Sequence, residues 1–104
     1  MAETITASVM RGAKLLDEKS PGWHRRINLH ALDLNDCQEC ILGQVYGEYA
    51  NGLETLFAGD QKYFSRYHFG FSSTYTGGKD RGMRRLTAAW MRLIVKRILG
   101  RLGG

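Results

Sequence analysis

The sequence predicts a mainly α protein, a single compact bundle of three to four helices over residues 1–104. Apolar residues recur at helical spacing in several stretches, and this periodicity is the main signal for helices. A hydrophobic content of 43% and a charged content of 24% are ordinary for a globular domain. A length of 104 residues corresponds to one domain. A short β element near residues 26–34 is an open alternative, because the apolar residues there fit neither the helical nor the strand period.

The first predicted helix covers about residues 5–18. Four residues at spacing i, i+4, i+7 and i+11 form its apolar stripe: Ile5, Val9, Gly12 and Leu16. Thr4 is a suitable N-cap. The segment Ser20-Pro21-Gly22 ends the helix, because a residue that precedes proline is pushed out of the α region.

The helix near residues 37–50 is predicted to be the central and most buried one. Asn35 or Asp36 is its expected N-cap. Two adjoining arcs of mostly apolar residues wrap over more than half of it: Cys37, Cys40, Ile41, Gln44 and Val45, then Leu42, Tyr46, Tyr49 and Leu53. Gly43 and Gly47 lie one turn apart. Because a glycine inside a helix costs ~1 kcal/mol, this pair predicts that another backbone passes close by.

Two further helices are predicted in the C-terminal half. A short one follows Asp60, carries three aromatic residues and ends at Gly70. Residues 70–79 are rich in Gly, Ser and Thr and predict a mobile loop. The last helix covers about residues 81–99, and residues 100–104 should fray. The inner faces together predict a main core of eight residues: Trp23, Leu42, Val45, Tyr46, Leu53, Leu86, Trp90 and Ile94.

The positive charge of the chain is concentrated near its C-terminus. Residues 79–101 hold eight Lys and Arg residues against one Asp, whereas residues 1–78 hold seven against nine Asp and Glu. Such asymmetry points to nucleic acid, an anionic surface or an acidic protein as a partner, although a solvated outer helix face is the simplest explanation of it. The candidate binding residues are Arg81, Arg85, Arg92 and Lys96 on one side of the last helix, with Phe71 and Tyr75 in the loop before it.

Cys37 and Cys40 form the only Cys-x-x-Cys motif, at the expected start of a helix. One interpretation is a zinc site completed by His24 and His30, although the histidine spacing does not match the usual tight helical pair. A second is a redox pair, although no βαβ setting accompanies it. A third is that both thiols are small core hydrophobes. The expected cofactor is accordingly none, or zinc.

The middle of the chain resembles a family of small uncharacterised proteins of actinobacteriophages. The pattern comprises Gly22-Trp23, Arg26-Ile27-Asn28-Leu29, Leu32-Asp33-Leu34, Cys37-x-x-Cys40, Leu42-Gly43-Gln44, Tyr46-Gly47, Tyr49 and Gly52-Leu53. Weaker matches follow at Phe69-Gly70-Phe71 and Leu86-Thr87-x-x-Trp90. They touch most of residues 11–95, and residues 92–101 are not part of the resemblance. It implies a phage or prophage origin and no particular activity.

Catalytic motifs are missing from the sequence. It contains no Gly-x-Ser-x-Gly, phosphate-binding loop or His-Glu-x-x-His pattern, so an enzyme is not the favoured interpretation. Its start lacks the features of a secretory signal and no apolar run is long enough for a membrane span, so the expected location is the host cytoplasm, without membrane insertion.

The favoured function is a non-enzymatic, phage-encoded interaction protein that modulates a host or phage macromolecule, for example by inhibiting a host process or defence system. A host or phage protein is the expected partner. The first alternative is a nucleic-acid-binding or regulatory protein that uses the basic helix. The second alternative is a zinc or thiol-redox protein centred on the two cysteines.

Overall fold

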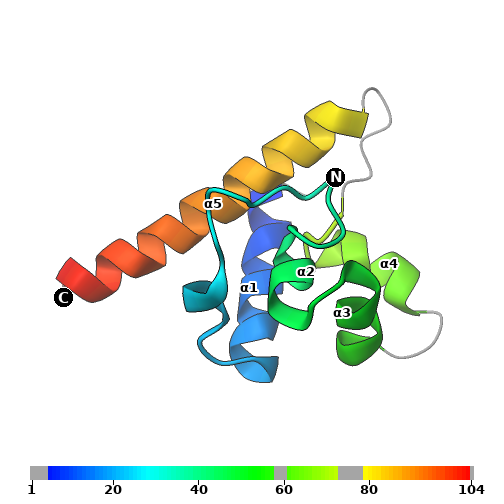
Figure 1. Cartoon of the computed structure of the whole chain (residues 1–104), viewed down its shortest axis with the longest axis horizontal. Helices are drawn as coiled ribbons and strands as arrows, with labels where there is room; N and C mark the ends of the chain where they lie inside the picture. The colour runs from blue at the N-terminus through cyan, green and yellow to red at the C-terminus, as the bar shows by residue number, and fades with distance from the viewer. Residues whose placement is uncertain (1–4, 58–60, 73–78, 104) are drawn as a thin grey trace.

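The computed structural model describes residues 5–57, 61–72 and 79–103, and in these ranges it confirms a mainly α fold. It contains five α-helices and one 3-10 helix: α1 (Ile5–Lys19), η1 (Trp23–Arg26), α2 (Ile41–Tyr46), α3 (Tyr49–Leu56), α4 (Gln61–His68) and α5 (Lys79–Gly103). Helix α1 packs against both α5 and α4. Figure 1 shows α5 as a long helix whose C-terminal turns extend past the rest of the chain.

The helix predicted near residues 37–50 is two short helices, α2 and α3, which raises the helix count above the predicted three to four. Gly47 separates them, with a left-handed φ of 92° that ends α2. The start is also later than predicted. The Asp36 carboxylate accepts hydrogen bonds from the amides of Gln38 and Glu39 and so caps a turn, and the N-cap of α2 is Cys40. The close backbone approach predicted for the glycine pair holds at Gly43, where an added Cβ would lie 2.4 Å from the carbonyl oxygen of Cys37, and is wrong at Gly47, where an added Cβ would meet no atom within 4 Å.

No strand forms at residues 26–34, so the alternative of a β element there is wrong. After η1 the chain runs through turns. The backbone of Asn28 is paired with a side chain instead of a neighbouring strand: its amide donates to Gln44 Oε1, and Gln44 Nε2 donates to its carbonyl oxygen. Gln44 Nε2 also donates to the carbonyl oxygen of Glu39. Because these hydrogen bonds satisfy the backbone of Asn28, this residue has no need of a sheet partner.

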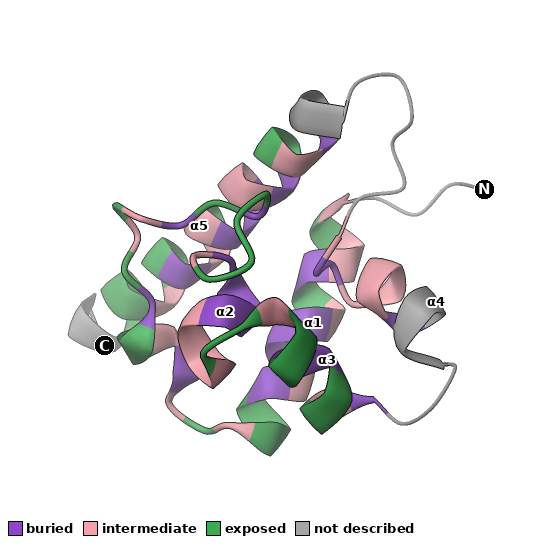
Figure 2. Ribbon diagram, turned by 45° about the vertical axis from the view of Figure 1, so that its right-hand side comes forward, coloured by how far each residue is buried: buried purple, intermediate pink, exposed green. Residues whose placement is uncertain are grey.

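Most of the predicted core is buried. Six of the eight predicted residues are buried, and the other two, Val45 and Tyr46, are half-buried against the core. In Figure 2 the buried positions of α1, α2 and α5 gather in the middle of the molecule. The α1 stripe is confirmed as well, because Val9, Gly12 and Leu16 are all buried.

Phe71, predicted as a binding residue of the loop before the last helix, is instead a core residue with 1% of its surface accessible. It stacks on Trp90, with ring centroids 5.6 Å apart and an angle of 12° between the planes. The reversal of direction at Gly70, whose φ is 74°, returns the chain to the core. Trp90 Nε1 then donates a hydrogen bond of 2.6 Å to the carbonyl oxygen of Gly70.

The remaining predictions concern the ends of the C-terminal elements. The short helix before Gly70 is present as α4, and α5 begins at Lys79, two residues before the predicted start. The fraying predicted for residues 100–104 is not seen through Gly103, where α5 ends, and residue 104 lies outside the described ranges. Of the predicted loop at residues 70–79, residues 73–78 lie outside the described ranges.

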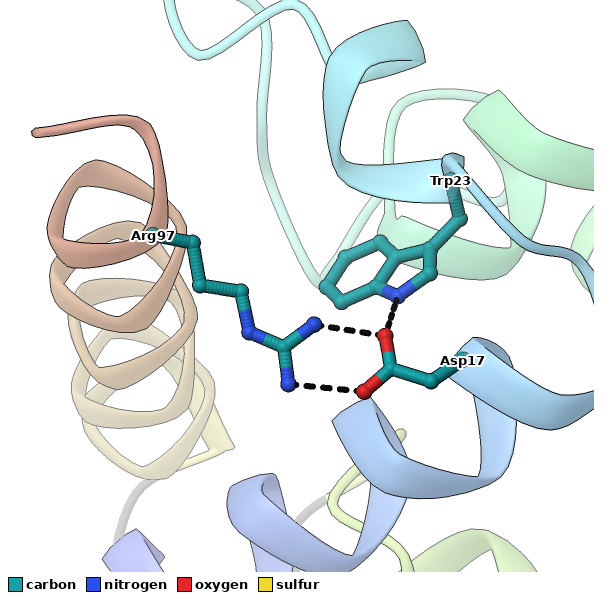
Figure 3. A network of polar contacts seen from close by, with 3 residues as sticks. All are labelled: Asp17, Trp23 and Arg97. Carbon is teal, nitrogen blue, oxygen red and sulfur yellow. Dashed lines mark hydrogen bonds and ion pairs between the residues drawn. The ribbon is translucent and has the colours of Figure 1, made fainter. Parts of the chain in front are cut away.

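A polar network ties α5 to α1 across the sequence. Arg97 donates to both carboxylate oxygens of Asp17, at 2.6 and 2.9 Å, and Trp23 Nε1 donates to the first of them at 2.9 Å. Figure 3 shows the guanidinium facing the carboxylate edge to edge. The hydrogen bonds from Arg97 hold the pKa of the Asp17 carboxyl below its ordinary value, although partial burial opposes this.

We expect Asp17→Asn to destabilise the protein at neutral pH by up to ~1 kcal/mol, since the pair is partly exposed and screened by solvent. The folded pKa lies below the ordinary value of 3.8, so the stabilisation is present above that value and is lost as pH falls through the folded pKa. The urea midpoints of wild type and variant should therefore converge in acid. Glu18→Gln, at an exposed neighbour, is the control. A constant difference between wild type and Asp17→Asn at all pH values would contradict this account.

Candidate functional site

A groove of about 660 Å³ lies between the N-terminal half of α1 and the C-terminal half of α5. Val9 and Met10 line it from α1. Leu93, Val95 and Leu99 line it from α5, so its surface is predominantly apolar. A second hollow of about 490 Å³ continues the groove along α1 toward Lys14, and the two share Met10, Leu93 and Lys96. The groove exists because α5 crosses α1 at an inner face and continues beyond it.

Large apolar side chains stand exposed along this groove. Met10 and Leu99 leave 60% and 61% of their surface accessible, and Val95 leaves 40%. Ile98, on the neighbouring part of α5, leaves 37%. A single exposed apolar residue needs no explanation, but a contiguous group marks an interaction site. This group is contiguous, because three of its members line one groove.

The helix α5 is apolar on two sides, which explains how the group arises. Leu86, Trp90 and Ile94 are spaced i, i+4 and i+8 and enter the core. A second set, at residues 91, 95 and 98, recurs at spacings of four and three residues on the outer side. The core needs only one of the two stripes. In the second, Met91 is half-buried against the core, and Val95 and Ile98 are left in solvent over the turns that extend past the body.

Three cationic side chains lie at the apolar groove and its continuation. Arg92 and Lys96 lie one helical turn apart on its α5 wall, and Lys14 lies on α1 in the continuation. Within the described part of the chain, no carboxylate pairs with any of these three side chains. Asp17, also in the continuation, is already engaged by Arg97. The groove therefore combines a predominantly apolar lining with two cationic side chains on its α5 wall.

Of the predicted basic stripe, the structure leaves Arg85, Arg92 and Lys96 exposed, as expected for an outer face. The side chain of Arg81 lies outside the described part, as does the whole of Tyr75. The stripe is not purely basic, because Val95 and Leu99 interrupt it. Sequence reasoning missed these apolar residues, although their spacing opposite Trp90 was the available signal.

The structure does not assemble the predicted metal site. Cys37 lies exposed in the turn before α2, and Cys40 is buried at its N-cap, so the pair does not occupy a first helical turn. His24 packs edge-on against Trp23 in η1, and His30 is exposed in a turn. Across residues 5–57, 61–72 and 79–103, no three His, Cys, Asp or Glu side chains group as metal ligands.

The two thiols have different environments. Burial raises the pKa of the Cys40 thiol, although the amide of Gly43 donates a hydrogen bond of 3.2 Å to its sulfur. A raised pKa disfavours the thiolate, which is the reactive species in redox chemistry. Cys40 therefore acts as a structural cap.

We expect native protein to expose one reactive thiol, that of Cys37, to an aromatic disulfide reagent. Cys40 is 2% accessible and should react only on unfolding. The measurement is the number of fast-reacting equivalents with and without denaturant, and Cys37→Ser should abolish the fast phase. Equal reaction rates for both thiols in native protein would show that the Cys40 thiol at the N-cap of α2 is accessible to solvent.

Comparison with protein-family models, curated proteins and solved structures finds no match for this chain. Among the helices in the described ranges, none is both long enough and apolar enough to cross a bilayer.

Proposed function

We propose that this chain is a non-enzymatic interaction protein that binds another protein through the groove between α1 and α5 and so modulates it. The observation that carries the proposal is the exposure of Met10 and Leu99 at a contiguous apolar groove. Surfaces of this kind are characteristic of protein–protein contacts, in which an apolar centre is enclosed by a polar rim. Arg92 and Lys96 supply polar, charged groups beside this apolar surface.

The proposal includes an origin and a setting. The resemblance of residues 22–53 to actinobacteriophage proteins supports a phage-encoded chain that acts in the cytoplasm of the host cell. The target is then a host or phage protein, and inhibition of a host process or defence system is the purpose that a small non-enzymatic protein would serve.

A nucleic-acid-binding function is the second candidate. The observation that favours it is the exposure of Arg85, Arg92 and Lys96 on one side of α5. Phosphate contacts from such residues release counterions and give affinity that falls steeply with salt. The apolar groove between the cations favours a protein partner, because Met10 and Leu99 would gain nothing from a phosphate backbone. No observation favours the third candidate, a zinc or thiol-redox protein.

Two sets of substitutions separate the first two candidates. Met10→Lys with Leu99→Lys puts charge into the apolar groove, so it should abolish docking of a protein while preserving or strengthening nucleic-acid binding. Arg85→Gln, Arg92→Gln and Lys96→Gln together should abolish nucleic-acid binding. All of these residues are exposed, so the fold should survive.

The test is affinity capture from host-cell lysate, with and without nuclease. We expect wild type to retain a protein regardless of nuclease and the lysine variant to lose it. Arg85→Gln alone, outside the groove lining, is the matched control that should keep it. If wild type and the lysine variant capture the same proteins, the proposal that a partner binds in the groove is wrong. Recovery of nucleic acid in place of protein would favour the second candidate.

A further inference from the structure

The shape of the groove limits what can fill it. The residues that line it on α5 run from Ala89 to Leu99, which corresponds to about 15 Å along a helix axis. Helix α1 supplies the second wall. A concave trough between two helices is complementary to a convex rod, and a third helix of about three turns has the matching length.

The chemistry of the groove specifies one face of that helix. Val9 and Leu93 lie deep, and the exposed side chains of Met10 and Leu99 can close over an apolar ligand. Methionine is unbranched and adapts to the side chains that it meets. A helix that enters such a groove uses apolar anchors at i, i+3 or i+4, and i+7.

The charges at the groove specify the flanks of the same helix. Arg92 and Lys96 are one turn apart, so carboxylates spaced by one turn on a partner helix can face both of them. Lys14 extends the positive charge onto α1. Building on the proposed function, we infer that the groove between α1 and α5 binds an acidic amphipathic helix of the partner protein, about three turns long.

Charge and shape argue against other occupants. A second copy would bring α5 against α5, and residues 79–101 hold eight Lys and Arg residues against one Asp. Like charges at such a contact oppose association. A bilayer surface is flat on this scale and leaves a concave apolar trough unfilled.

The test uses synthetic helical probes of defined charge against the full chain. The first is a fluorescein-labelled, stapled peptide of about four turns with Leu anchors at helical spacing and Glu flanks. The second replaces every Glu by Lys, and the third is the acidic composition in scrambled order. Fluorescence anisotropy should show the acidic amphipathic peptide binding at least about tenfold more tightly than either of the others.

A charge swap supplies the decisive control. Arg92→Glu with Lys96→Glu should reverse the preference, so that the Lys-flanked peptide binds more tightly than the Glu-flanked one. Arg85→Glu changes the net charge on the same helix but outside the groove lining, and it should leave the preference unchanged. A preference that shifts equally with Arg85→Glu would show long-range electrostatics in place of docking, and would overturn the inference.

The outcomes also separate this inference from the proposed function. If none of the peptides binds preferentially while Met10→Lys with Leu99→Lys still abolishes capture of a protein from lysate, the inference fails and the function stands. If the groove substitutions also leave the capture of protein unchanged, both the inference and the proposed function fail. Binding of anionic-lipid vesicles or duplex DNA that displaces the acidic peptide would overturn the inference in favour of a membrane or nucleic acid. Self-association in sedimentation that groove substitutions abolish would overturn it in favour of a second copy.

Discussion

Trp90→Ala is expected to remove ~3–5 kcal/mol from the free energy of unfolding, enough to leave a domain of this size marginally folded. Trp90 is fully buried. Its ring stacks on Phe71 and meets Trp23 edge-on, with a centroid separation of 5.6 Å in the first pair and 5.7 Å in the second. The substitution would remove both contacts and leave a cavity where α1, η1 and the turn after α4 meet.

Trp90 also satisfies a backbone group, which gives the prediction a second component. Without its indole N–H, the carbonyl oxygen of Gly70 loses a buried hydrogen bond. Trp90→Phe keeps most of the aromatic surface and loses this bond, so it should cost ~1–3 kcal/mol, less than alanine.

The measurement is equilibrium unfolding in urea with tryptophan fluorescence and circular dichroism as probes. Leu99→Ala is the matched control, because it removes a large apolar side chain from the same helix at a position that is 61% exposed. Its effect should stay within about 0.5 kcal/mol. A loss for Leu99→Ala equal to that for Trp90→Ala would mean that α5 uses its outer stripe in the core.

The periodic parts of this fold follow from the sequence. Helix α1 and the inner face of α5 have apolar residues at helical spacing, and burial of that face is what makes them helices. The non-periodic parts depend on contacts between distant residues. The burial of Phe71 requires Trp90 to be in place, and the order of residues 26–34 requires Gln44 to reach Asn28.

The N-cap of α2 could not be predicted from the sequence either, because two nearby residues are cap candidates of similar strength. Asp36 and Cys40 both precede α2 and both have an atom that accepts an amide hydrogen bond. The usual N-cap preference favours Asp36. Its carboxylate, however, accepts hydrogen bonds from the amides of its own turn, so Cys40 is the N-cap of α2 instead.

The candidate site was predictable only in its charges. Arg92 and Lys96 were expected on an outer face and lie there. The apolar centre of the groove was missed, although the inner stripe of Leu86, Trp90 and Ile94 was predicted correctly, because nothing in the periodicity of α5 shows that its outer apolar residues meet a second wall from α1. The larger side chains of Trp90 and Leu86 go inside, and residues 95, 98 and 99 stay outside.

Gly12→Ala is expected to destabilise the protein by ~1–3 kcal/mol, although alanine is the better helix former. Gly12 is buried in α1 where the chain around Phe69 crosses it. An added Cβ would lie 2.1 Å from the carbonyl oxygen of Phe69 and 2.9 Å from the Trp90 ring. A backbone carbonyl cannot rotate away as a side chain can, so α1 itself must shift and loosen its packing.

Gly100→Ala makes the same chemical change where nothing opposes it. Gly100 lies within α5, and an added Cβ there would meet no atom within 4 Å. The variant should gain up to ~1 kcal/mol, because alanine loses less conformational freedom in a helix than glycine. Thermal and urea unfolding of the two variants should therefore shift in opposite directions from wild type. A shift of the same sign in both would show that the close approach at Gly12 does not constrain α1, and that helix propensity alone decides the effect.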